Sequence, residues 1–288
     1  MLKKQDIIRA LLKMTPKERR VIGEEVKKEV TRVKELEQKE RKKLFFPQVL
    51  AKAITKVLPC VISESELDNF AFRGCENILF ESEKSQLKIV ATDGHEMAFT
   101  SIYVEENLPQ GKWLLDRKTA KELKNELKTA EAVNLKIGVG DGNLHFEVFT
   151  EKRKPRVFST FLGDFPIYQA AILKAFESEA TFKAIDMKVA LREAKGVRIV
   201  KLSLDSERQI TQLSFAKIGL KEAREIETEI EGEIKKGPSL FILFNRTYLW
   251  KMAQTLGGEI TLRAKDAYSP VLFEGKGINW LIMPIIKQ

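Results

Sequence analysis

The sequence contains a faint internal repeat with a period of about 128 residues, and this repeat constrains the fold more than any single motif does. The first copy runs from a strand-like segment at 113–117, through a helical stretch, to an alternating segment at 133–148. The second copy runs in the same order from 242–246 to 260–273. Because each copy reads strand, helix and then strands, we predict that the chain contains one kind of folding unit twice.

Residues that start or end helices and turns stand at matching places in the two copies. Asp116 and Asn245 each lie between strand and helix, where a short polar side chain can cap the first helical turn. The Asp-Gly pair at 141–142 favours a tight hairpin inside the first alternating segment. The Gly-Gly pair at 257–258 favours the end of the second helix.

Each unit also begins with a helix. Apolar residues recur at helical spacing between Pro47 and Pro59, and again around Met187 and Leu191. Two helices and several short strands make each unit an α+β domain. We therefore predict a basic helical arm over residues 1–44, one α+β domain over 45–172 and a second over 173–288, with the joint near 170–181.

Most of the net positive charge lies in the N-terminal segment. Residues 1–44 contain ten Lys and five Arg against one Asp and seven Glu, a net charge of +7, whereas the whole chain has a net charge of +9. A long predicted helix in this arm carries one narrow apolar stripe, formed by Ile22, Val26 and Val30. The arm therefore favours contact with a polyanion or, equally, a solvated charged helix that docks on a partner or on the protein's own body.

Four predicted helices carry Lys and Arg on a face separate from their apolar residues. On helix 117–130, Arg117, Lys121 and Lys124 recur at helical spacing. Such a helix can follow phosphates without reading bases. For one helix alone a solvated face is the better explanation, but four helices in two repeated units predict a shared surface for double-stranded DNA. The candidate DNA-binding residues are Lys52, Lys56, Arg117, Lys118, Lys121, Lys124, Lys128, Lys188, Arg192, Lys195, Arg246 and Lys251.

Other classes of function find little support. No run of roughly 18 apolar residues could span a membrane, and we recognise no signal peptide. The two cysteines and two histidines stand at no metal-ligand spacing, so we expect no metal, no cofactor and a reducing, cytoplasmic location. We find no catalytic triad or nucleophile elbow and expect no enzymatic activity. Glu227, Glu229 and Glu231 alternate along a predicted strand, which is typical of a solvent-facing side.

The segment 87–98, LKIVATDGHEMA, resembles the most recognisable segment of the bacterial DNA sliding clamp family, the beta subunit of DNA polymerase III. In that family this strand and turn lie in the middle domain. Further segments fit in the right order, and the resemblance covers about residues 46–288. They are 113–127, 161–168 (FLGDFPIY), 242–256, 268–272 (YSPVL) and 280–284 (WLIMP).

The resemblance implies two repeated DNA-clamp domains of the processivity fold, with helices on a basic inner face and antiparallel sheets outside. It implies a clamp that encircles duplex DNA non-specifically and holds DNA polymerase and the clamp loader, whose short apolar motifs enter a pocket between the domains. Carried over position by position, the pocket residues are Cys75, Thr92, Gly94, His95, Met97, Pro166, Ala170, Ala171, Tyr268, Pro270, Leu281, Ile282, Met283, Pro284 and Ile285.

Two departures from the family pattern change what we expect. The helical arm stands where the family has its first domain, so that two domains per chain would need three chains to make six. We therefore expect a homotrimeric ring. In addition, Glu96 stands where the family usually has Arg, and Ala170 where a basic residue is common. Both changes remove positive charge beside the predicted pocket, and the partner motif is then expected to differ.

Two alternatives remain open at this stage. A ringless, clamp-like regulator would bind clamp partners and compete for them without encircling DNA. A structural subunit of a larger assembly would use the arm as its assembly element. Primer extension on circular templates separates the first alternative from a working clamp, and deletion of residues 1–44 separates the second.

Overall fold

A computed structural model describes residues 47–62, 74–104, 108–129, 132–151, 154–218 and 223–286. The predicted arm over residues 1–44 lies outside these ranges. Within them, no helix is both long and apolar enough to cross a membrane.

The described residues of the first unit form two helices, a 3-10 turn and seven strands. Residues 47–57 are helical, as predicted between Pro47 and Pro59, and continue into η1 (Leu58–Cys60). The remaining elements are β1 (Asn77–Glu83), β2 (Gln86–Thr92), β3 (Glu96–Tyr103), β4 (Gly111–Asp116), α3 (Arg117–Lys128), β5 (Ala132–Gly140), β6 (Asn143–Thr150) and β7 (Arg156–Ser159). The 3-10 helix η3 (Tyr168–Ala171) lies in the connection to the second unit.

In the second unit, the residues that the structure describes form two helices and nine strands. Its elements are β8 (Ser178–Lys183), α4 (Ala184–Glu193), β9 (Ile199–Asp205), β10 (Ile210–Ile218), β11 (Ala223–Ile230), β12 (Gly232–Lys236), β13 (Leu240–Asn245), α5 (Arg246–Leu256), β14 (Glu259–Ala264), β15 (Val271–Gly275) and β16 (Ile278–Ile282). The order β4-α3-β5-β6 thus recurs as β13-α5-β14-β15, which confirms the predicted repeat.

The capping and turn residues act as predicted. Asp116 accepts a hydrogen bond from the backbone N–H of Thr119, and Asn245 accepts one from Thr247. Residues 141–142 turn between β5 and β6, and Gly257 follows α5 with a φ of 56°. Helix α3 ends two residues before the predicted boundary, because the N–H of Thr129 turns back to the carbonyl of Glu126.

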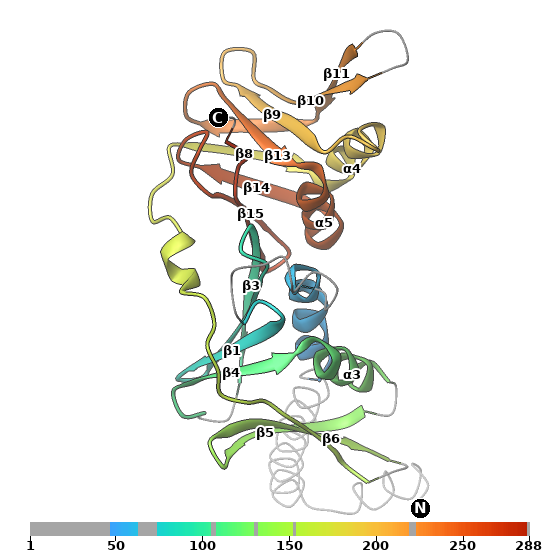
Figure 1. Ribbon diagram of the computed structural model, residues 1–288, viewed down its shortest axis with the longest axis vertical. Helices are drawn as coiled ribbons and strands as arrows, with labels where there is room; N and C mark the ends of the chain where they lie inside the picture. Colours follow the sequence, from blue (N-terminus) through green and yellow to red (C-terminus); the bar gives the residue numbers. More distant parts are fainter. Residues whose placement is uncertain are drawn as a thin grey trace, which may run out of the picture.

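One nine-stranded sheet runs through both units, in the order β12-β8-β14-β15-β16-β3-β2-β1-β4. The units meet where β16 pairs antiparallel with β3, with Leu281 opposite Met97 and Trp280 opposite Ala98. Two smaller sheets, β11-β10-β9-β13 and β5-β6-β7, complete the second and first units. In Figure 1 these smaller sheets lie toward opposite ends of the long axis of the molecule.

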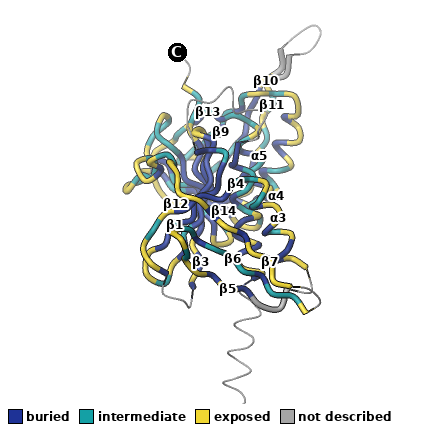
Figure 2. The backbone as a smooth tube through the Cα atoms, turned by 60° about the horizontal axis from the view of Figure 1, so that its bottom comes forward, coloured by how far each residue is buried: buried dark blue, intermediate teal, exposed yellow. Residues whose placement is uncertain are grey.

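All four described helices lie along one side of the molecule. Figure 1 shows α4, α5, the helix at 47–57 and α3 following one another beside the sheets. Their apolar faces cover the main core, whose buried residues Figure 2 shows as dark blue stretches of backbone at the centre of the molecule. Trp280, Phe182, Phe80 and Phe146 are the largest of its fully buried side chains. This packing leaves the polar faces of the helices toward solvent.

Candidate functional site

The sequence-predicted basic residues occupy the outward faces of the four helices. On α3, Ala120, Leu123 and Leu127 are buried. The candidates that are exposed on the four helices are Lys52, Lys118, Lys121, Lys128 and Arg192, and Lys195 is exposed in the turn that follows α4. Those partly buried are Lys56, Arg117, Lys124, Lys188, Arg246 and Lys251. Because the helices share one side of the molecule (Figure 1), these cations lie along one side as well.

Like charges on α3 are close enough to affect one another. Burial lowers the pKa of Lys124 from its ordinary value, and the ammonium groups of Lys128 and Lys121 lower it further. A cluster of like charges is costly in the free protein and favours an anionic partner that neutralises it. Successive phosphates of a duplex are such a partner.

Some of the candidate cations are held by groups of their own chain. Arg117 donates a hydrogen bond to the carbonyl of Val61 at 2.9 Å. Arg246 donates to the carbonyl of Leu191 at 2.9 Å through Nε, and its guanidinium lies over the Trp250 ring. These contacts fix helix positions, so we expect weaker phosphate binding from these two than from the exposed lysines.

Lys276 lies beside the basic residues of the helix at 47–57, although sequence reasoning missed it. It lies in the turn between β15 and β16, and its carbonyl accepts a hydrogen bond from Lys56 on the helix at 47–57. Burial lowers the pKa of Lys56, and the nearby charges of Lys276 and Lys52 lower it further. The sequence shows only an exposed Lys-Gly turn here, and the long-range pairing that brings this turn to the helix has no local signal.

Part of the predicted peptide pocket forms a second hydrophobic cluster, separate from the main core. Met97 and Leu281 lie opposite each other across the β3–β16 joint, and Ala171 of η3 packs against the cluster. Sequence reasoning missed other members: Leu79, Val90, Phe99, Leu114, Tyr168 and Leu272, with Phe165, Ile172 and Phe176 packed against them. Two of these, Val90 and Phe99, stand two residues from a predicted pocket residue on the same strand, and strand alternation could have identified them.

The turn between β2 and β3 is held rigidly at the edge of this cluster. The Asp93 carboxylate accepts hydrogen bonds from the N–H groups of His95 and Glu96, and the Thr92 hydroxyl donates to the Glu96 carbonyl. Gly94 has a φ of 87°, a region that glycine enters freely. The His95 carbonyl accepts a hydrogen bond from the N–H of Met283, which ties the C-terminal segment to the turn.

The other predicted pocket residues differ in exposure and in the face they occupy. Tyr268 and Met283 are exposed, with 68% and 38% of their surface accessible. Ile282 packs into the main core rather than the second cluster, because it alternates with Leu281 on β16. Gly94, His95 and Ala170 are exposed, Thr92 and Cys75 are buried, and Pro166, Pro270, Pro284 and Ile285 are partly buried.

A polar contact holds the connecting segment against the second cluster. The Tyr168 hydroxyl of η3 donates a hydrogen bond to the Glu81 carboxylate on β1, and the Lys112 ammonium lies 3.1 Å from the same carboxylate. Burial and this hydrogen bond raise the pKa of the Tyr168 phenol well above its ordinary value. Burial alone would raise the pKa of Glu81, but the bonds from Tyr168 and Lys112 lower it.

A buried carboxyl group of the first unit contacts two residues of the second unit across the joint. Glu96 on β3 has a fully enclosed side chain, and it receives the Lys251 ammonium of α5 at 2.6 Å. The Trp280 indole N–H donates to its other oxygen at 3.1 Å. Burial raises the pKa of Glu96 to about 8, against the lowering effect of Lys251. Burial alone would lower the pKa of Lys251, but the charge and hydrogen bond of Glu96 raise it.

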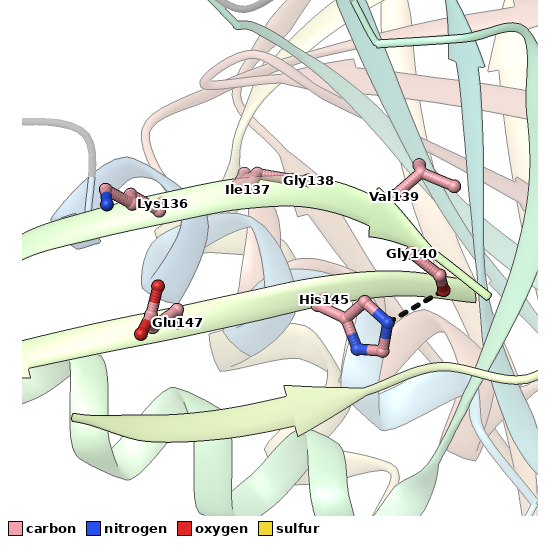
Figure 3. A pocket seen from close by; sticks show the side chains of 7 residues that line it. All are labelled: Lys136, Ile137, Gly138, Val139, Gly140, His145 and Glu147. Carbon is pink, nitrogen blue, oxygen red and sulfur yellow. Dashed lines mark hydrogen bonds between the residues drawn. The ribbon is translucent and has the colours of Figure 1, made fainter. Parts of the chain in front are cut away.

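A further pocket lies on the outer side of the β5–β6 hairpin, away from the predicted sites. Figure 3 shows its lining: Lys136, Ile137, Gly138, Val139, Gly140, His145 and Glu147. The His145 ring lies 2.9 Å from the Gly140 carbonyl and 2.8 Å from the Ser159 hydroxyl. Since a carbonyl only accepts, Nε2 carries the proton and Nδ1 accepts from Ser159. Across the described ranges, no three His, Cys, Asp or Glu side chains gather to hold a metal ion.

Comparison with known proteins identifies what this arrangement resembles. Residues 47–166 match the family described as DNA polymerase III beta subunit, central domain. The Beta sliding clamp of Haemophilus influenzae is 29% identical over an alignment of 219 residues, and the match covers 72% of this chain and 56% of that protein. The Beta sliding clamp of Caulobacter vibrioides is 27% identical over an alignment of 215 residues, and the match covers 71% of this chain and 55% of that protein.

Solved structures give the same result for the fold. The DNA polymerase III beta subunit of Thermotoga maritima has a TM-score of 0.70 at 22% identity and covers 84% of this chain and 64% of its own. The subunit from Pseudomonas aeruginosa has a TM-score of 0.69 at 19% identity, covering 84% of this chain and 65% of its own. The chain thus has the fold of these proteins, and it spans little more than half the length of the curated relatives it matches.

Proposed function

We propose that this chain, which shares its fold with bacterial DNA polymerase III beta subunits, is itself a DNA sliding clamp that encircles duplex DNA without reading its sequence. The observation that carries the proposal is the placement of all four described helices on one side of a sheet that runs unbroken through both units. Their exposed Lys and Arg side chains point away from the core. Such a surface suits phosphates spread along a duplex rather than one bound ligand.

The partner site of the proposal is the second hydrophobic cluster around Met97 and Leu281, with exposed Tyr268 and Met283 at the predicted pocket. A short apolar motif of a DNA polymerase or clamp loader would place its anchors there. The chain would act as a tether, with no catalytic activity of its own, and would work in the cytoplasm. Domains at 45–172 and 173–288 would provide the two clamp modules, and a closed ring of six modules would be a homotrimer.

The proposed ring has a topological test that needs no loader. The protein is mixed with linear duplex DNA anchored at one end, the other end is then capped with a bulky protein, and the DNA is washed in about 1 M salt, which screens phosphate contacts. We expect protein to remain on capped DNA and to leave uncapped DNA. Equal loss from both would contradict encirclement.

Two further measurements separate the clamp from its rivals. Light scattering at micromolar concentration should give the mass of three chains, and a monodisperse monomer would contradict the ring. Primer extension on a circular template should become more processive with a clamp, whereas a decoy that captures polymerase would make it less processive. The second assay uses the polymerase and loader of the source organism, because the partner motif is expected to be specific.

A further inference from the structure

The internal joint shows how two units of this fold connect. Strand β16 ends the run β14-β15-β16, and β3 begins the run β3-β2-β1-β4. They pair edge to edge, with backbone partners from Asn279 opposite Phe99 to Ile282 opposite Glu96. The contact therefore joins two sheet edges through backbone hydrogen bonds and needs no insertion of one unit into the other.

Each unit carries a second edge that corresponds to one side of this joint. The sheet β11-β10-β9-β13 has the strand order of β3-β2-β1-β4, which makes β11 the counterpart of β3. The sheet β5-β6-β7 has the order of β14-β15-β16, which makes β7 the counterpart of β16. Among the described strands, none pairs with β11 on the side away from β10, or with β7 on the side away from β6.

The geometry points to a head-to-tail contact in which β7 of one copy pairs antiparallel with β11 of the next copy and repeats the internal β16–β3 joint. The two edges belong to sheets toward opposite ends of the long axis (Figure 1), as a head-to-tail contact requires. The inference rests on the proposed function for its purpose, since it names the contact that would close the ring, but its geometry comes from this chain alone.

The correspondence fixes the position of β7 against β16. Phe158 of β7 lies opposite Phe146 of β6, as Trp280 of β16 lies opposite Phe273 of β15. All four side chains are buried in the main core. Phe158 is therefore the counterpart of Trp280.

The equivalent helix caps Asp116 and Asn245 fix the position of β11 against β3. Three residues before each cap stand Trp113 and Ile242, which pair with Phe80 and Leu202, and these pair in turn with Ile89 on β2 and Leu213 on β10. Two residues further along, Ala91 of β2 is therefore the counterpart of Phe215 of β10. Ile226 of β11 lies opposite Phe215 of β10, as Ala98 of β3 lies opposite Ala91 of β2. Ile226 is only partly buried, although its side chain packs on the main core. A strand paired along β11 would cover it further.

The internal joint then supplies the register of the proposed contact. Because Trp280 lies opposite Ala98, Phe158 would lie opposite Ile226 of the next copy. One position along each strand, Val157 would lie opposite Glu227 of the next copy. Val157 has 58% of its surface exposed, and a strand paired along β7 would cover it.

Charge favours this pairing over the pairing of two identical edges. Glu225, Glu227 and Glu229 are exposed on β11. Within the chain, Lys201 forms an ion pair with Glu225, and Gln212 donates a hydrogen bond to Glu227. Two β11 edges would bring these like charges together, which is unfavourable. The lead into β7 is basic instead, with Lys154 and Arg156 exposed. Arg156 already contacts Glu126 at 2.8 Å, which leaves Lys154 for the neighbouring acidic edge.

Site-specific cross-linking tests the contact and its register. The variant Val157→Cys/Glu227→Cys is treated with a short bis-maleimide, which bridges directly opposed strand positions. The natural cysteines, Cys60 and Cys75, are buried and should not react. The matched control is Val157→Cys/Glu207→Cys, because Glu207 is exposed in the turn between β9 and β10 of the same sheet.

We expect the Val157/Glu227 pair to give covalent trimers and the control pair to give monomers. Cross-linked dimers from a single variant would show that identical edges pair and would overturn the inference. So would an oligomer by light scattering that the Val157/Glu227 pair fails to cross-link. Efficient cross-linking without retention on end-capped DNA would instead uphold the contact and contradict the proposed clamp function.

Discussion

The Lys251 ammonium lies 2.6 Å from the Glu96 carboxylate and connects α5 of the second unit with β3 of the first. The carboxylate also accepts the indole N–H of Trp280, so all three groups meet where the two units join. Above the pKa of Glu96 the two groups carry opposite charges, and removing one partner would then leave an uncompensated buried charge, which is strongly destabilising. The joint therefore depends on a polar contact inside an otherwise hydrophobic sheet interface.

Stability should fall with rising pH because of Glu96. Its pKa is raised to about 8 in the folded chain, against 4.5 ordinarily. Between these values the folded chain binds more protons than the unfolded chain, so the free energy of unfolding decreases as pH rises, by at most roughly 1.4 kcal/mol per pH unit. The urea concentration at the midpoint of unfolding should therefore decrease as pH rises, and Glu96→Gln should reduce this pH dependence. A slope unchanged in Glu96→Gln would rule out this carboxyl as its source.

Neutralising α3 should weaken DNA binding and its salt dependence. The triple change of Lys121, Lys124 and Lys128 to Ser removes up to three phosphate contacts, so the slope of log affinity against log salt should decrease by roughly 2 to 3. Anisotropy titrations with a labelled duplex at several salt concentrations measure it. A matched control changes Lys84, Lys174 and Lys235, which are exposed and lie off the helices. If both triple changes had equal effects on DNA affinity, α3 would not be part of the DNA interface.

Exposed side chains at the predicted pocket should contribute to peptide binding without supporting the fold. Tyr268→Ala should weaken binding of a peptide with leucine and phenylalanine anchors about tenfold or more, as expected for an aromatic anchor. Its thermal midpoint should hardly change, because 68% of Tyr268 is exposed. Tyr103→Ala is the control, with 67% of the side chain exposed on β3. Equal affinities of the two variants would place the peptide elsewhere.

Loss of a helix cap should destabilise the first unit. Asp116→Ala removes the acceptor for the N–H of Thr119 at 2.9 Å and should lower the free energy of unfolding by about 1 kcal/mol. Asp116→Asn keeps an acceptor and should recover most of it. Chemical denaturation measures both variants, and equal losses would show that the cap contributes little.

Reversing charge on the β11 edge should weaken assembly. Glu227→Lys would oppose the basic lead into β7 of a neighbouring copy and should raise the concentration at which the oligomer dissociates. Light scattering across a dilution series measures this shift. Glu233→Lys, on the exposed side of β12, is the control. An oligomer equally stable in both variants would mean that β11 lies outside the contact.

Patterns within about one turn or one hairpin could be predicted from the sequence. The residues next to Asp116, Asn245 and the turn at 141–142 in the sequence were enough to predict two helix caps and a hairpin turn. The internal repeat identified both units. The Glu96–Lys251 contact could not be predicted, because 155 residues separate the partners and neither has a distinctive spacing. Sequence reasoning had assigned Lys251 to DNA, an assignment that stays a prediction beside its contact with Glu96.

The same limit applies to the candidate pocket. Family resemblance identified Met97 and Leu281, but Tyr168 enters the second cluster only because the connecting segment crosses the outer side of the sheet. The alternating glutamates of β11 looked like a solvent-facing pattern, and strand order was needed to see that β11 is also an unpaired edge among the described residues. Periodicity shows which face a side chain occupies, whereas topology shows which edge is free.

The unbroken nine-stranded sheet has a mechanical consequence for the proposed ring. A shared ladder of backbone hydrogen bonds transmits bending from one unit to the other, so each chain should move as a stiff arc rather than as two hinged halves. Admission of a duplex would then require separation at a seam between chains. In a trimer three such seams are equivalent, and parting one would leave every arc intact.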